Sequence, residues 1–211
     1  YIPLRYKSRK DKHPPIIAIC DVSGSMSRYS RMLLHFMHVL TTLRNEVHTF
    51  LFGTRLTNVT RFLRFKDVDE ALAATSSAVE DWSGGTRIGD CLKEFNFNWS
   101  RRVLGPGPIV LFITDGLDRG GGIGLSKQIK LIQKSSKRLI WLNPLLRYEE
   151  FAPKPIGVKA ILPHVDEFRP IHSLESMDQL VNALSETNLQ SRFNMAPWLE
   201  KLSEIENAEC H

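Results

Sequence analysis

Two short apolar runs constrain the fold more than any other feature of this 211-residue sequence. Residues 15–20 and 109–114 are almost entirely apolar, have strand length and show no polar alternation. Such runs are typical of strands buried on both faces, as in parallel α/β sheets. Each run is followed directly by an acidic residue, Asp21 or Asp115, in a segment of small and polar residues. The sequence therefore predicts buried parallel strands with acidic loops at their carboxyl ends.

Predicted strands and helices alternate along most of the chain, which indicates a doubly wound, mostly parallel α/β sheet with helices on both faces. The gap between the second and third predicted strands is short enough for an antiparallel edge strand. In such sheets, ligands bind outside the carboxyl ends of the strands, where the strand order reverses. We expect strands at 15–20, 47–52, 57–65, 109–114, 139–142 and 160–162, and helices at 31–43, 67–79, 88–103, 125–135 and 174–184.

Charge and composition suggest three segments. Residues 1–13 hold five basic residues and one acid, and the sequence begins with Tyr rather than Met. We therefore expect a basic linker from a preceding N-terminal region, in preference to an arm that binds nucleic acid, because no zinc-finger or RNA-binding signature accompanies it. Residues 14–186 are predicted to form the α/β domain, and residues 187–211 a tail or a short helix around 198–205.

The cysteines and the hydropathy pattern indicate which cellular compartment we expect for the protein. Cys20, Cys91 and Cys210 are odd in number and far apart in the sequence, so a disulfide framework is not expected. Cys20 lies in an apolar run and is predicted to be a small buried residue. No stretch approaches the roughly 20 apolar residues of a membrane span. These features favour a cytoplasmic protein without a membrane span.

Polar oxygen ligands gather on three loops of the predicted sheet. Asp21, Ser23 and Ser25 alternate in the loop after the first strand, Thr86 follows two glycines before a helix, and Asp115 follows the fourth strand. These side chains offer only oxygen atoms, which suit Mg²⁺, and also Mn²⁺ or Ca²⁺, better than Zn²⁺. Two carboxylates and three hydroxyls leave some coordination positions of the ion to water or to an outside ligand. A carboxylate from another molecule could complete the coordination, so the pattern favours metal-bridged recognition.

These motifs resemble the metal-ion-dependent adhesion site (MIDAS) of von Willebrand factor type A (VWA) domains. The resemblance rests on Asp-x-Ser-x-Ser at 21–25, Gly-Gly-Thr at 84–86 and Thr-Asp-Gly at 114–116, and extends over residues 14–186. It implies a Rossmann-like sheet with one antiparallel edge strand. It also implies that hydroxyl groups contact the ion directly while the carboxylates act partly through water. The implied metal ligands are Asp21, Ser23, Ser25, Thr86 and Asp115.

A narrower resemblance connects the chain with the CoxE-like bacterial subgroup of VWA domains. It rests on Asp-Val-Ser-Gly-Ser-Met at 21–26, Phe-Met-His-Val-Leu at 36–40, Thr-Phe-Leu-Phe-Gly-Thr at 49–54 and Trp-Ser-Gly-Gly-Thr-Arg-Ile-Gly at 82–89. In that subgroup the domain ends a longer protein and works beside a MoxR-type AAA+ ATPase. The resemblance implies a protein partner that offers Asp or Glu. It further implies a role in maturing a client enzyme, such as the molybdenum–copper site of carbon monoxide dehydrogenase.

Other residues admit more than one interpretation. His35 and His38 could bind a metal, but their amphipathic helix favours packing or one hydrogen bond. Asp90 could orient the site or interact with a helix dipole, and Arg87 could attract an acidic partner or be solvated. Residues 120–124 are glycine-rich and could cradle a phosphate, but they lack a P-loop lysine, so a flexible loop is favoured.

Enzymatic function is not expected. The sequence has no Gly-x-Ser-x-Gly elbow, and nothing in it nominates a base for Ser23 or Ser25. The alternative to a binding module is a metal-dependent hydrolase acting on a phosphorylated or carboxylated small substrate. Generic phosphate esters would distinguish the two, because only the hydrolase would turn them over.

Overall fold

The computed structural model describes residues 13–79, 85–148, 150–185 and 194–209. They form a six-stranded sheet in the order β3-β2-β1-β4-β5-β6. All neighbouring strands are parallel except β3, which is antiparallel to β2 at the edge of the sheet. The predicted doubly wound, mostly parallel sheet is therefore confirmed. The strands are β1 (Ile16–Asp21), β2 (Val47–Phe52), β3 (Leu56–Asn58), β4 (Ile109–Ile113), β5 (Arg138–Asn143) and β6 (Glu167–Pro170).

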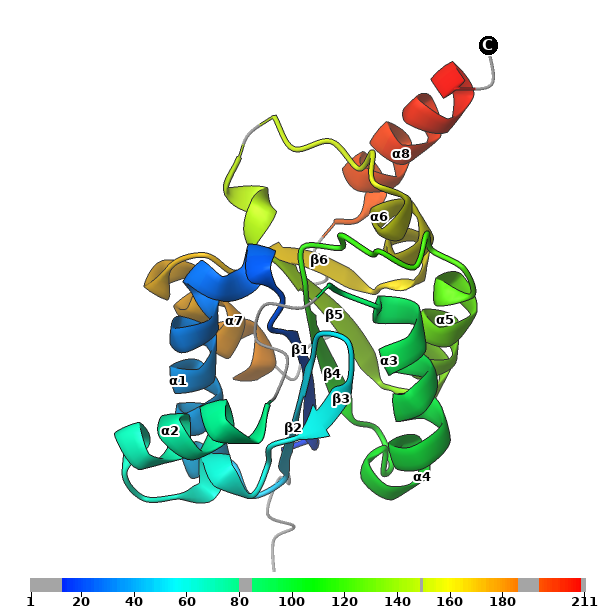
Figure 1. Ribbon diagram of the computed structural model, residues 1–211. Coiled ribbons are helices and arrows are strands. Elements are labelled where there is room, and N and C mark those ends of the chain that lie inside the picture. The colour runs from blue at the N-terminus through cyan, green and yellow to red at the C-terminus, as the bar shows by residue number, and fades with distance from the viewer. Residues whose placement is uncertain (1–12, 80–84, 149, 186–193, 210–211) are drawn as a thin grey trace, which may run out of the picture.

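Helices cover both faces of the sheet (Figure 1). One face packs against α1 (Ser27–Leu43), α2 (Val68–Ala78) and α7 (Leu174–Ser185), and the other against α3 (Ile88–Glu94), α5 (Leu125–Ser135) and α6 (Ile156–Ile161). Successive residues of β1 alternate between the two cores, with Ala18 in the first and Ile19 in the second. Because both faces are covered, the strand needs no polar alternation, as predicted for its apolar run.

The starts of α2 and α1 show how local sequence determines where these helices begin. The side chain of Asp67 accepts a hydrogen bond of 2.9 Å from the backbone N–H of Glu70, so it is the N-cap that the sequence predicts for α2. Helix α1 begins at Ser27, four residues before the apolar periodicity starts, since the 3₁₀ turn η1 (Gly24–Met26) leads directly into it. The chain therefore passes from the first acidic loop into α1 without a flexible connection.

The third predicted strand, at 57–65, is wrong over most of its length. Only Leu56–Asn58 pairs with β2, and the chain then turns into a 3₁₀ helix, η2 (Phe62–Arg64). The side chain of Asn58 accepts a hydrogen bond of 3.0 Å from the N–H of Thr60, and the Thr60 hydroxyl accepts one of 3.0 Å from the N–H of Thr49. The first bond closes an Asx-type turn that ends the strand, and the second connects this turn to β2.

The last predicted strand, at 160–162, is also wrong. These residues end α6 and begin the 3₁₀ helix η5 (Leu162–His164), because a short buried apolar run does not distinguish a helix from a strand. The last strand is β6, whose Glu167 is fully buried. Glu167 forms ion pairs with Arg138 of β5 and with Arg169. This pairing lets a charged side chain be buried in β6, at the edge of the sheet.

Two further segments differ from expectation in detail. The helix predicted at 88–103 is interrupted between α3 and α4 (Ser100–Val103) by a π-helical stretch, η3 (Phe95–Trp99). At the C-terminal end, α8 (Ala196–Glu209) extends away from the sheet (Figure 1) and is longer than the short helix expected there. Its Trp198 packs edge-to-face on Phe168 of β6. Among the described helices, none has the length and apolar character needed to cross a membrane.

Candidate functional site

The two acidic loops meet where the strand order reverses. β1 and β4 are adjacent and parallel, so their carboxyl ends lie at one edge of the sheet. The helix that follows β1 is α1, whereas the helix that follows β4 is α5, and these helices lie on opposite faces. A crevice at this position is where doubly wound sheets bind ligands.

Asp21 is the best-anchored polar residue of the first loop. Its side chain is fully buried, and its Oδ1 accepts a hydrogen bond of 2.8 Å from the N–H of Ser23. Its Oδ2 accepts a second bond of 2.7 Å from the hydroxyl of Thr114, which lies at the end of β4. The hydroxyls of Ser23 and Ser25 are hydrogen-bonded at 3.2 Å. The carboxylate thus connects the first loop to the end of β4.

The pKa of Asp21 is raised to about 6, mainly by burial and to a smaller extent by the charge of Asp115, while the hydrogen bonds from Ser23 and Thr114 act in the opposite direction. Asp115 is also buried, with 2% of its surface exposed. Within the described ranges, neither carboxylate forms an ion pair with a basic side chain. Two neighbouring buried carboxylates are costly without a compensating cation.

Side chains of the adjacent strand β5 donate hydrogen bonds to the chain at the end of β4 and in the loop that follows it. The Oδ1 of Asp115 accepts a hydrogen bond of 3.0 Å from the N–H of Leu117, and its carbonyl accepts one of 3.2 Å from the side chain of Asn143. The indole N–H of Trp141 donates to the carbonyl of Thr114 at 3.0 Å. The position of Asp115 is therefore fixed by buried side chains of the neighbouring strand, none of which the sequence motif identifies.

The third loop is described from Gly85 onward, and Ser83 and Gly84 lie outside the described residues. Thr86 is buried, with 4% of its surface exposed, and its carbonyl accepts a hydrogen bond of 2.9 Å from the N–H of Arg119. The N–H of Arg87 donates to the carbonyl of Gly53 at 3.1 Å. These bonds hold Thr86 between the end of β2 and the loop after β4.

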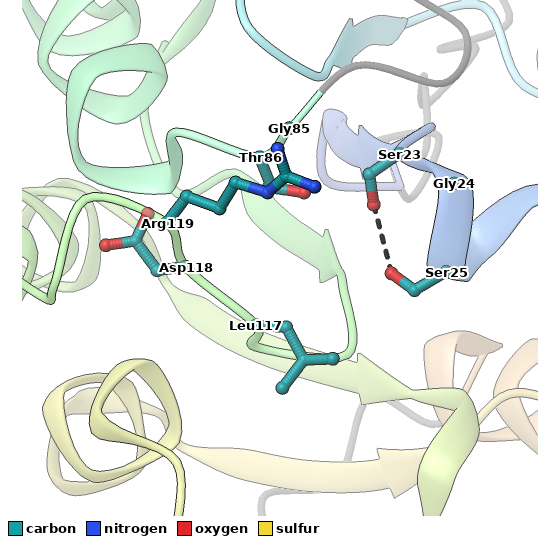
Figure 2. Close-up of a pocket in the computed structure, with 8 residues that line it drawn as sticks. All are labelled: Ser23, Gly24, Ser25, Gly85, Thr86, Leu117, Asp118 and Arg119. Carbon is teal, nitrogen blue, oxygen red and sulfur yellow. Dashed lines mark hydrogen bonds between the residues drawn. The ribbon is translucent and has the colours of Figure 1, made fainter.

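The three loops enclose a pocket with a volume of about 310 Å³. Figure 2 shows Ser23 and Ser25 on one side of it, with Gly85 and Thr86 facing them. The predicted ligands thus fall into two groups, because the three hydroxyl residues line the pocket while Asp21 and Asp115 are buried and do not line it. The lining residues are Ser23, Gly24, Ser25, Gly85, Thr86, Leu117, Asp118 and Arg119.

The structure also places the residues that admitted two interpretations. Arg87 and Asp90 are exposed and do not line the pocket. His38 is buried and its Nδ1 lies 3.1 Å from the carbonyl of Leu63, whereas His35 is exposed. In the described part of the chain, no three His, Cys, Asp or Glu residues are grouped so that they could hold a metal ion.

The glycine-rich loop is organised by Asp118. One oxygen of this side chain accepts a hydrogen bond of 2.9 Å from the N–H of Ile88, and the other accepts one of 2.9 Å from the N–H of Gly122. Backbone N–H groups of this kind are what a phosphate would use. Because a carboxylate already occupies them, the loop does not favour a phosphate site.

The fold and the arrangement of loops define a VWA-type protein, and the comparison with protein families agrees. The family model for VWA domain containing CoxE-like proteins matches residues 1–177. The chain therefore belongs to this family. VWA domains are generally interaction modules rather than enzymes. A comparison with curated proteins finds no significant match.

Solved structures share the fold at low sequence identity. Proximal thread matrix protein 1 from the mussel byssus superposes with a TM-score of 0.55 at 16% identity, over 82% of this chain and 47% of that one. The BatB protein of Bacteroides thetaiotaomicron gives a TM-score of 0.51 at 14% identity, over 82% of this chain and 98% of that one. A second structure of the mussel protein, described as having a zinc-occupied MIDAS motif, gives 0.50 at 17% identity, over 82% and 44%. The chain thus spans under half the length of the mussel protein.

Proposed function

We propose that this protein is a metal-ion-dependent interaction module that binds an acidic side chain of a protein partner. The observation that supports it most strongly is the pairing of two buried carboxylates, without ion pairs among the described residues, with a pocket lined by hydroxyls. Mg²⁺ is the proposed ion, and Mn²⁺ or Ca²⁺ would suit the same donors. The proposed ligands are Asp21, Ser23, Ser25, Thr86 and Asp115.

The five proposed ligands have two different roles, which follow from whether each side chain lines the pocket or is buried behind it. Ser23, Ser25 and Thr86 line the pocket and would contact the ion, while Asp21 and Asp115 would supply negative charge from below, partly through water. When bound, Mg²⁺ would supply a positive charge with an open coordination position. Thr114 and Asn143 hold the acidic loops in place through hydrogen bonds to Asp21 and to the carbonyl of Asp115. The zinc-occupied MIDAS of the mussel protein is consistent with this assignment, because that protein shares the fold.

Membership of the CoxE-like family supports a proposal about the identity of the protein partner. We propose that the acidic residue comes from a MoxR-type AAA+ ATPase or from its client, and that the complex acts in a reducing compartment such as the cytoplasm. The client would be an enzyme whose metal cofactor is assembled after folding, similar to carbon monoxide dehydrogenase. Cys20 and Cys91 are free and buried, which fits such a compartment.

A hydrolase receives no specific support from the site. Two carboxylates are few for a metal-dependent phosphohydrolase, and the described pocket contains no histidine or lysine that could act as a base. Ser126 Oγ and His164 Nε2 lie 2.7 Å apart, but neither residue lines the pocket. Turnover of a generic phosphate ester in Mg²⁺ that is lost in Asp21→Asn would contradict the interaction module.

Binding of Mg²⁺ is expected to stabilise the domain. A single ion present at about 100 times its Kd should raise the free energy of unfolding by about 2.7 kcal/mol, which corresponds to roughly 5–10 °C in Tm for a chain of this size. Calorimetric titration of the metal-free chain should give one ion per chain, and EDTA should reverse the shift in Tm. A stoichiometry of zero would refute the metal site.

A further inference from the structure

Arg119 is the one basic side chain among the described residues that line the pocket. It belongs to the loop after β4, and Figure 2 shows its side chain extending across the pocket toward Gly85 and Thr86, on the side that faces Ser23. The sequence drew attention to Arg87 instead, which is exposed and outside the lining. A positive charge thus stands beside the hydroxyls proposed to hold the ion.

The backbone of Arg119 is fixed on both sides. Its N–H donates to the carbonyl of Thr86 at 2.9 Å, so the residue is tied to the third loop. Its neighbour Asp118 accepts hydrogen bonds from Ile88 and Gly122, as described above. The guanidinium is therefore presented from a loop whose geometry the fold determines, although the side chain itself is exposed.

Gly85 leaves the space that this guanidinium occupies. A Cβ atom at position 85 would lie 2.6 Å from Cδ and 2.8 Å from Nη1 of Arg119. Real Cβ atoms do not approach other atoms so closely, so any larger residue would displace the arginine side chain. The backbone of Gly85 lies outside the left-handed region, so alanine is compatible with it.

The guanidinium of Arg119 has no acidic partner among the residues that the structure describes. Within the described ranges, Arg119 forms no ion pair, although Asp118 is its neighbour. An arginine fork matches the two oxygens of a carboxylate, and such charge-assisted bonds are stronger than neutral ones. A guanidinium without an ion pair among the described residues, together with a bound ion, would offer two points of attachment to one carboxylate.

We propose that Arg119 is a specificity-determining residue that binds the second oxygen of the carboxylate whose first oxygen binds the metal. The inference rests on the proposed function and adds the chemistry of recognition. It predicts that the partner presents the side chain of Asp or Glu, or a terminal carboxylate. Hydroxyl and amide groups could reach the ion but would leave the guanidinium unpaired. Gly85 is then required because it admits the arginine side chain.

The test separates metal binding from carboxylate binding. Mn²⁺ alone is titrated into the full chain and followed by electron paramagnetic resonance. Acetate is then titrated into the Mn²⁺-loaded chain and followed by the loss of water-proton relaxation as it displaces metal-bound water. Arg119→Gln removes the fork, Gly85→Ala displaces it while keeping the charge, and Arg87→Gln is the matched control for loss of one nearby positive charge.

In Arg119→Gln, the affinity for acetate should fall about tenfold, while the affinity for Mn²⁺ stays within about threefold because like charges separated by solvent repel weakly. Gly85→Ala should show a similar loss, and Arg87→Gln should behave as the unaltered chain.

Unchanged acetate affinity in both pocket variants would overturn the inference while leaving the metal site intact. A gain of more than tenfold in Mn²⁺ affinity without loss of acetate binding would instead show that Arg119 competes with the ion, which also overturns it. Absence of Mn²⁺ binding by the unaltered chain would refute the proposed function, and the two-point contact with it.

Discussion

Asp21→Asn is expected to weaken Mg²⁺ binding by about 100-fold or more, because it removes a buried negative charge beside the ion. The fold should survive the change. An asparagine at this position can still accept the N–H of Ser23, and the hydroxyl of Thr114 can rotate to accept from the new amide. The variant also loses the cost of burying a charge, so its metal-free stability should lie within about 1 kcal/mol of the unaltered chain.

Calorimetric titration with Mg²⁺ and thermal unfolding with and without the ion measure both effects. Asp90→Asn is the matched control, because it removes the same charge from an exposed position in the first turn of α3 outside the pocket. It should keep its Mg²⁺ affinity. If Asp21→Asn lowers the metal-free stability by several kcal/mol but keeps its response to Mg²⁺, Asp21 is a structural loop residue and the ligand assignment is wrong.

Gly157→Ala is expected to destabilise the domain by about 3 kcal/mol through overpacking. Gly157 lies in α6, where a Cβ would stand 2.3 Å from the carbonyl oxygen of Gly116. The obstacle is a backbone atom of the loop after β4, so neither side can yield easily. Gly116 itself has a φ of +81° and lies against Trp141 and Val158, which further limits movement. The loop that carries Asp115 would therefore have to shift.

Chemical denaturation of the metal-free chain measures this loss, and Mg²⁺ titration of the folded fraction should show weaker binding. Gly105→Ala serves as the control, because a Cβ at Gly105 would meet nothing within 4 Å. Its stability should change by no more than about 0.5 kcal/mol. Equal stability of the two variants would contradict the close packing of α6 on the loop after β4.

The strands that the sequence predicted well are those whose environment is uniform. β1 and β4 lie between two helical layers, so every position is buried and the apolar run reveals the strand. β6 was missed because its character depends on a distant residue. Glu167 is buried with ion pairs to Arg169, two positions later, and to Arg138, which lies 29 positions earlier. A single sequence does not show that pairing, whereas the apolar residues at 160–162 gave a false signal.

In the candidate site, too, the sequence reveals the residues that belong to local motifs but not those brought in from distant parts of the chain. Its five proposed ligands follow from spacing within three short motifs, because each motif is local. The residues that position or complete the site come from elsewhere in the fold. Thr114 belongs to the Thr-Asp-Gly motif and could have been noticed there, but Asn143 reaches the site from β5. Arg119 could not be distinguished from Arg87 by sequence, since only the course of the glycine-rich loop brings it over Gly85.

The most direct test of metal-bridged recognition is a pull-down from lysate of the source organism. The chain is used as bait in Mg²⁺, in EDTA, and as Asp21→Asn in Mg²⁺, with Asp90→Asn as the matched control. We predict a protein, expected to be a MoxR-type AAA+ ATPase or its client, that is retained by the unaltered chain and by Asp90→Asn only when Mg²⁺ is present. Equal retention of that protein in EDTA and by Asp21→Asn would contradict the account and place its binding surface away from the carboxyl ends of β1 and β4.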